Sequence, residues 1–161
     1  MLGAIPFGNH RHGTRAYEQV VELSPLCGNV NFVFMNLFID ICLIAVSAAV
    51  GALTRTGVSH VCRRILGDGF PLGTLLVNVT GCFLLGLLVA CGTPTQNRRI
   101  YLALASGFLG SLTTFSTFGL ETVSHAQRGN WHISTTSVVA NLVLGFLAVF
   151  VGLLIGSRIR A

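Results

Sequence analysis

Long runs without a charged residue alternate with short clusters of arginine along this chain. Charge-free windows occupy residues 41–54, 69–97, 100–120 and 129–157, and the first apolar stretch begins near Leu37. A helix needs about 20 mainly apolar residues to cross the hydrocarbon core of a bilayer. The pattern therefore predicts four transmembrane helices, with expected bounds of 37–54, 72–91, 100–123 and 132–156.

The composition indicates the same class of protein. Hydrophobic residues make up 52% of the 161 residues, charged residues make up 9%, and the mean hydropathy is +0.76. Soluble domains are about 25% charged. The predicted fold class is therefore all-α, an integral membrane protein of four helices. Its loops are short, so any functional site has to lie within the membrane.

Catalytic and metal-binding patterns are absent from the sequence. The five cysteines form no CxxC pair, and the five histidines lie at no ligand spacing from cysteines or carboxylates. They predict neither a disulfide framework nor a zinc-type site. Paired carboxylates and a base–nucleophile set are also lacking. These observations disfavour an enzyme.

All ten basic residues are arginines, and eight of them follow the predicted helices. Helices one and three are followed by Arg55, Arg63, Arg64 and Arg128, and helices two and four by Arg98, Arg99, Arg158 and Arg160. With four arginines on each side, the positive-inside rule assigns no orientation. The balance favours a chain that inserts both ways and pairs antiparallel. The alternative is that Arg11 and Arg15 decide the orientation. The loop positions also explain the basic pI without a nucleic-acid partner.

Residues 1–34 differ from the rest in composition. Their first part is polar and contains Gly, His and Arg, and the segment lacks the pattern of a signal peptide. Met35 stands directly before the first hydrophobic helix. We interpret residues 1–34 as a leader, either added by a mis-assigned start or disordered as a tail. Residues 35–161 form the predicted membrane domain.

The third predicted helix carries an unusual polar run, "GSLTTFSTFGLE", at residues 110–121. Backbone polar groups within a bilayer have to be satisfied by the protein, so a helix breaks there only where it is buried or lines a cavity. Gly107 and Gly110 allow a close approach or a break, and neighbouring hydroxyls can satisfy freed backbone groups. Breaks of this kind bind ions in membrane proteins. The alternative is a helix-packing face rich in small residues.

Further polar or aromatic positions recur at helical spacing. Phe115 and Phe118 share a face if their segment is helical, and the edges of their rings carry partial positive charge. An amide within the membrane, as at Asn78, is a site candidate unless it only joins helices. Three sets complete the pattern: Thr74 one turn before Asn78; Ser137, Asn141 and Gly145 on one stripe of helix four; and the packing pair Gly152 and Gly156.

Three motifs in the same order resemble the Fluc (CrcB) family of fluoride channels. They are "VGALTR", "PLGTLLVNVTGCFLLG" and "GFLGSLTTFSTFGLE", and the similarity extends from about Leu37 to Gly156. The resemblance implies a passive, fluoride-selective channel in the inner (plasma) membrane, spanning it several times and reducing fluoride toxicity. It also implies an antiparallel dual-topology dimer, of two copies or of two related subunits.

The resemblance also implies roles for individual residues. A structural sodium ion at the dimer centre would be bound by the backbone carbonyls of Gly110 and Thr113. Arg55 and Glu121 would be charges at the pore ends. The fluoride pore would comprise Thr74, Asn78, Phe115, Ser116, Thr117, Phe118, Ser137 and Asn141.

The sequence departs from this family at Ser111, Ser137 and Gly145, where many members have glycine, a larger polar residue and a hydroxyl. These departures bear on how fast the channel conducts and on whether it needs a partner subunit, more than on the family to which the chain is similar. One rival is a small dual-topology multidrug-type transporter. Such a transporter needs a carboxylate in the middle of helix one, whereas Asp40 lies at the start of the expected helix. A non-transporting packing subunit is the other rival, and it leaves the clustered hydroxyls, Asn78 and the Phe pair unexplained.

Overall fold

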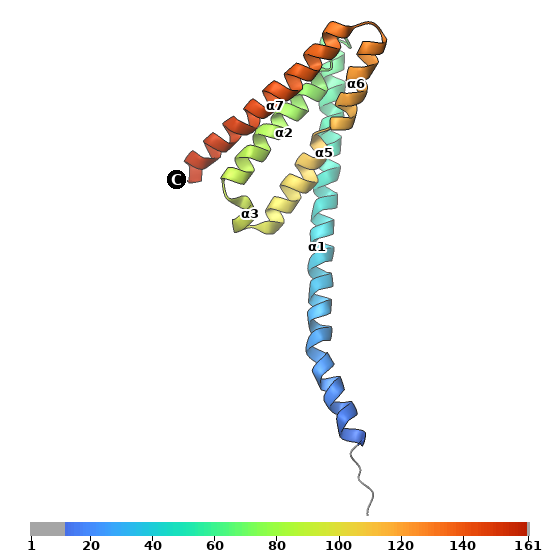
Figure 1. The fold of residues 1–161 in the computed structure, drawn as a ribbon, viewed down its shortest axis with the longest axis vertical. Coiled ribbons are helices and arrows are strands. Elements are labelled where there is room, and N and C mark those ends of the chain that lie inside the picture. Colours follow the sequence, from blue (N-terminus) through green and yellow to red (C-terminus); the bar gives the residue numbers. More distant parts are fainter. Residues whose placement is uncertain (1–11, 161) are drawn as a thin grey trace, which may run out of the picture. The chain divides into compact units, whose positions relative to one another are not determined.

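The computed structural model describes residues 12–160, which are helical apart from short turns (Figure 1). The chain divides into two units, Met1–Ile39 and Asp40–Ala161. The elements are α1 (His12–Leu66), α2 (Leu72–Ala90), α3 (Thr93–Gln96), α4 (Arg98–Tyr101), the π-helix η1 (Leu102–Leu109), α5 (Gly110–Leu112), α6 (Phe115–Gln127) and α7 (Trp131–Arg160). The described part of the first unit is helical throughout, and its side chains from Val30 to Ile39 are almost all exposed.

Within residues 12–160, four segments are long and apolar enough to cross a membrane, which confirms the all-α, four-helix prediction. They are Val30–Leu66, Leu72–Ala90, Arg98–Gln127 and Trp131–Arg160. The second segment ends within one residue of its predicted bounds. The others extend further, because a charge-free window marks the part that lipid accepts and not the end of the helix. Helices α1, α2 and α6 end instead beside glycines with positive φ: Gly67, Gly92 and Gly129.

The N-terminal leader stays a prediction. Its residues 1–11 lie outside the described residues, and residues 12–34 are the first part of α1. The expected helix over 37–54 was therefore too short at both ends. Asp40, expected at the start of a helix, lies well inside α1 instead.

The third segment is broken within the polar run 110–121, as the sequence predicts. Thr113 and Thr114 have extended backbones, with φ/ψ of −79°/152° and −150°/117°, and they separate α5 from α6. The sequence offered Gly107 and Gly110 for either a close approach or a break, and both are helical. Gly107 provides the close approach instead, since a Cβ there would lie 2.9 Å from the carbonyl oxygen of Ile44. The π-helix before the break had no sequence signal.

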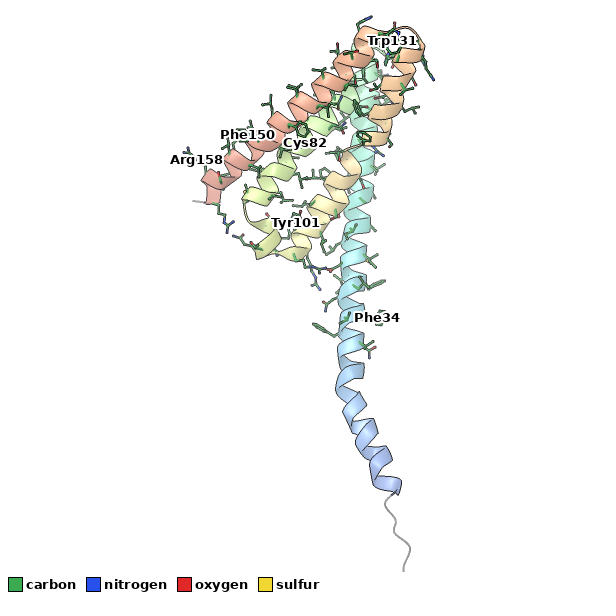
Figure 2. All side chains as sticks on the ribbon, in the orientation of Figure 1. Phe34, Cys82, Tyr101, Trp131, Phe150 and Arg158 are labelled. Carbon is green, nitrogen blue, oxygen red and sulfur yellow. The ribbon has the colours of Figure 1, made fainter. Side chains whose placement is uncertain are left out.

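Helices α2 and α7 pack side by side through glycines (Figure 1). A methyl group at Gly86 would overlap the carbonyl oxygen of Val149, and one at Gly152 would overlap that of Phe83. The predicted packing face of Gly152 and Gly156 is thus confirmed. Figure 2 shows Trp131 and Arg158 at the two ends of α7. Close contact between these backbones places α2 side chains within reach of α7.

An ion pair connects α1 of the second unit to the start of the third segment. Asp40 is only 6% exposed, and its carboxylate accepts hydrogen bonds from Nη1 of Arg98 at 2.6 Å and Nε of Arg99 at 3.3 Å. A carboxylate removed from water is costly unless it is paired and hydrogen-bonded. The pairing therefore accounts for an acidic residue within an otherwise apolar part of α1.

The glycine packing of α2 and α7 gives a first testable prediction. Gly152→Ala should lower the free energy of unfolding by about 1–3 kcal/mol, because the added methyl group cannot be placed without moving the Phe83 backbone. Thermal unfolding of the purified protein in detergent, followed by circular dichroism, measures this change.

The matched control is Gly145→Ala in the same helix. Its methyl group would meet only the sulfur of Cys82, at an ordinary 3.6 Å. Both substitutions give α7 the same gain in helix propensity. Equal unfolding temperatures for the two variants would contradict the packing argument.

Candidate functional site

The side chain of Asn78 on α2 bridges the break in the third segment. Its Oδ1 accepts a hydrogen bond from the amide of Thr114 at 2.9 Å, and its Nδ2 donates to the carbonyl of Thr114 at 3.3 Å. Nδ2 also donates to Oδ1 of Asn141 on α7 at 2.9 Å. One amide side chain thus joins the broken segment to α2 and α7. The sequence predicted Asn78 and Asn141 as site residues, and the structure brings them into contact.

Thr114 caps the second half of the broken segment. Its Oγ1 accepts from the amide of Thr117 at 3.2 Å and donates to Oγ1 of Thr117 at 3.0 Å. The hydroxyl of Ser116 lies 3.4 Å from the same Oγ1. A threonine in extended conformation is a favoured N-cap, because its hydroxyl satisfies a free amide of the first helical turn. The predicted hydroxyls of Ser116 and Thr117 therefore gather around the break.

The break releases backbone carbonyls from the helical pattern, among them those of Gly110 and Thr113. In an unbroken α-helix the amide of Thr114 would donate to the carbonyl of Gly110, and that of Thr117 to the carbonyl of Thr113. These amides donate instead to the side chains of Asn78 and Thr114. The carbonyls of Gly110 and Thr113 have lost their usual helical donors.

A cavity of about 360 Å³ adjoins the break, and we call it the aromatic cavity. Asn78, Asn141, Phe115 and Phe118 all line it. The two rings lie 5.7 Å apart between centroids and are tilted by 58°, which confirms that they share a helix face. Phe118 is 8% exposed, whereas Phe115 is 82% exposed. Gly110, Thr113, Gly145 and Cys82 complete much of the wall, and Figure 2 shows Cys82 on α2 near α7.

A second cavity of about 490 Å³, the polar cavity, lies among α1, α2 and α6. Thr74 and Glu121 line it, and Oγ1 of Thr74 donates to Oε2 of Glu121 at 2.6 Å. Thr74 is 3% exposed and Glu121 is partly buried. A hydrogen bond to an ionised carboxylate is short and strong. The structure therefore pairs two residues that the sequence proposed separately.

Ser137 is completely buried on α7, and its Oγ has no hydrogen-bond partner among the described residues. Its carbonyl accepts from Nδ2 of Asn141 at 3.0 Å, which orients the Asn141 side chain. A buried hydroxyl without a partner is rare in proteins. Ser137 thus lies one turn from the Asn78–Asn141 contact with an unused polar group.

The structure does not place every predicted site residue at these cavities. Arg55 is partly buried on α1 and lines neither of them. Thr114, by contrast, is more important than the sequence suggested. The sequence indicated it only as one of several hydroxyls in the polar run, whereas the structure shows it as the N-cap of α6 and the partner of Asn78. Its position directly before a new helix is a recognisable N-cap signal. His125 and Arg128 also line the polar cavity, and no pattern in the sequence predicted this position for them.

Comparison with known proteins gives one family. The family described as "CrcB-like protein, Camphor Resistance (CrcB)" matches residues 42–153. A protein of Dehalococcoides mccartyi named "Fluoride-specific ion channel FluC" is 42% identical over 123 residues, covering 75% of this chain and 95% of its own. A protein of the same name from Vibrio cholerae is 40% identical and covers 68% of this chain and 88% of its own length. Another, from Agrobacterium fabrum, is 42% identical and covers 75% of this chain and 98% of its own length.

The matched region contains α2, the break and the larger part of α7, and so includes both asparagines that meet at the break. The three motifs of the sequence and this match agree in extent. The chain therefore belongs to the CrcB family.

Proposed function

We propose that this protein is a fluoride-specific ion channel that lets cytoplasmic fluoride leave the cell down its electrochemical gradient. The observation that carries this proposal is the uncharged polar cluster at the break, where Asn78, Thr114 and Asn141 meet in the wall of the aromatic cavity. The relatives named fluoride-specific ion channels are about 40% identical over most of their length. The multidrug-type alternative receives no support, because the Asp40 carboxylate is paired with Arg98 and Arg99.

Fluoride is small and strongly hydrated, so a pore has to replace its water with hydrogen-bond donors. We infer that Nδ2 of Asn78 is one such donor. Its contact with the Thr114 carbonyl is long, at 3.3 Å, and is the weaker of its two hydrogen bonds. An anion arriving from the aromatic cavity would replace that contact at small cost. Neutral donors also release the anion readily, as conduction requires.

The remaining pore assignments follow the same chemistry. Ring edges of Phe115 and Phe118 would present partial positive charge toward the aromatic cavity. The hydroxyls of Ser116 and Thr117 would extend the path along α6. On α7 the buried hydroxyl of Ser137 is free to donate. Thr74 and Glu121 would form the end of the path at the polar cavity, and Arg55 would contribute charge outside it.

We propose that the functional unit is an antiparallel dimer of this chain, or a pair of it with a related subunit. Phe115 supports this, because its ring lines the aromatic cavity and is 82% exposed in one chain, so a second chain packed there would close the cavity. Such a dimer would come from a dual-topology chain embedded in the plasma membrane. Residues 35–161 would form its channel domain, with residues 1–34 as a leader.

A sodium ion fits the released carbonyls of Gly110 and Thr113. Carbonyl oxygens are ligands for hard cations, and unwound carbonyls in broken membrane helices commonly bind them. Four such oxygens, two from each chain, would surround an ion at the dimer centre. Its charge would stabilise the broken segments by occupying carbonyls that no helical amide reaches.

Fluoride efflux from liposomes is the direct test of the proposed function. Vesicles containing the purified chain alone should lose fluoride rapidly after a potassium ionophore is added, and should retain chloride. Ion-selective electrodes record both. Equal flux of the two anions would refute fluoride specificity. An inactive but folded chain that gains flux when mixed with a related chain would indicate paired subunits.

Asn78→Asp tests the proposed donor. The carboxylate keeps an acceptor for the Thr114 amide but removes both donors and adds negative charge, so fluoride efflux should fall at least about tenfold. The matched control is Asn97→Asp, because Oδ1 of Asn97 only accepts from the Ile100 amide and a carboxylate can do the same. Undiminished efflux through a folded Asn78→Asp channel would exclude this role.

A further inference from the structure

His125 is a partly buried titratable group that the proposed fluoride path does not use. It lies in the last turn of α6 and lines the polar cavity. Its Nδ1 is buried and has no hydrogen-bond partner among the described residues. A buried ring nitrogen without a partner costs free energy. Imidazole also changes charge between about pH 5 and 8, unlike other unperturbed side chains.

Charged groups from three parts of the chain face the same cavity. They are Arg63 of α1, Asp68 of the following turn, and Glu121 and Arg128 of α6. Two are cationic and two anionic, so their formal charges balance while His125 is neutral. The thiol of Cys62 also lines the cavity, whereas the lining residues from α2 carry no titratable side chain. Protonation of His125 would therefore change the formal charge of the cavity from neutral to positive.

Glu121 is the carboxylate that His125 is placed to meet. The two residues are four apart on α6 and line one cavity, a spacing at which side chains on a helix face each other. An acidic residue four positions before a basic one is also the favourable order. Asp68 is exposed to solvent, where its charge is screened, while Glu121 is partly buried. A protonated Nδ1 would gain in Glu121 the partner that it lacks.

The Glu121 carboxylate already has a partner in Thr74. Oγ1 of Thr74 donates to it at 2.6 Å, so the hydroxyl hydrogen points at Glu121 and not at an anion in the path. Thr74 lies one turn before Asn78 on α2, and it is almost fully buried. An imidazolium that pulled the carboxylate toward itself would lengthen this contact, and the Thr74 hydroxyl would then be free to donate elsewhere.

We propose that His125 is a positioning residue for fluoride conduction. When protonated, it draws the Glu121 carboxylate away from Thr74 and adds positive charge to the polar cavity. The released Thr74 hydroxyl then donates to fluoride, so that fluoride flux through the channel rises as the pH falls. This role rests on the proposed function, because it concerns the end of the same fluoride path.

The test compares fluoride efflux at about pH 8 and about pH 5 on both sides of the vesicle, spanning the range in which imidazole titrates. Efflux from protein-free vesicles is subtracted at each pH, because hydrogen fluoride crosses lipid unaided. The unmodified chain should show about twofold faster efflux at the lower pH, the size expected from one pair at this helix spacing. In His125→Gln the ratio should be about one. The control His132→Gln alters an exposed histidine of α7 and should keep the ratio of the unmodified chain.

Glu121→Gln provides a second variant in case His125→Gln does not fold. A neutral amide still accepts from Thr74 but attracts a cationic imidazole far less, so the ratio should fall below that of the unmodified chain. Efflux with equal rates at both pH values in the unmodified chain would overturn this role of His125 and leave the channel assignment intact. A ratio retained in both variants would overturn it as well. Folded protein that passes no fluoride at either pH would refute the proposed function and this role together.

Discussion

The two-way hydrogen bond between Asn78 and the backbone of Thr114 is the contact on which the other features of the site depend. Within a bilayer an interrupted helix exposes amides and carbonyls that lipid cannot satisfy. The side-chain amide of Asn78 offers one acceptor and one donor to the same residue, much as a neighbouring backbone would. Without it the Thr114 amide would be left unpaired, at a cost of about 1–3 kcal/mol. The break is therefore held in place by a hydrogen-bonded contact with α2 and is not a consequence of local flexibility.

Close packing of small residues allows this contact to form. The glycines of α2 and α7 bring the two backbones together, so that Asn78 reaches Asn141 as well as the break. Gly81 lies against the methyl group of Thr113, and any side chain at Gly81 would push the broken segment away. Larger residues in place of these glycines would separate the helices, and Asn78 would no longer reach Asn141 and Thr114. The apolar glycine face and the polar cluster are therefore parts of one arrangement.

Much of this architecture could be predicted from the sequence because its causes are local. Charge-free windows gave the four spans, and the hydroxyl run gave a broken third segment. Asn78 was a candidate since an amide is costly in lipid. The hydroxyl run could not single out the residues of the break, because Thr114 is joined to Asn78 by tertiary hydrogen bonds that no local pattern contains. The pairing of Thr74 with Glu121 likewise depends on a contact between distant segments.

The distribution of polar groups suits a path for a strongly hydrated anion. Around the break the donors are neutral amides and hydroxyls, while arginine, histidine and carboxylate side chains gather at the polar cavity. A cationic side chain at the break would hold fluoride too tightly, and a purely apolar one would not replace its water. The buried Ser137 hydroxyl fits the same logic. Its unused hydrogen-bonding capacity costs free energy, and under the proposed function an anion that reached this hydroxyl would recover that cost. A donor left partly unsatisfied thus favours brief occupancy by an ion over permanent pairing within the protein.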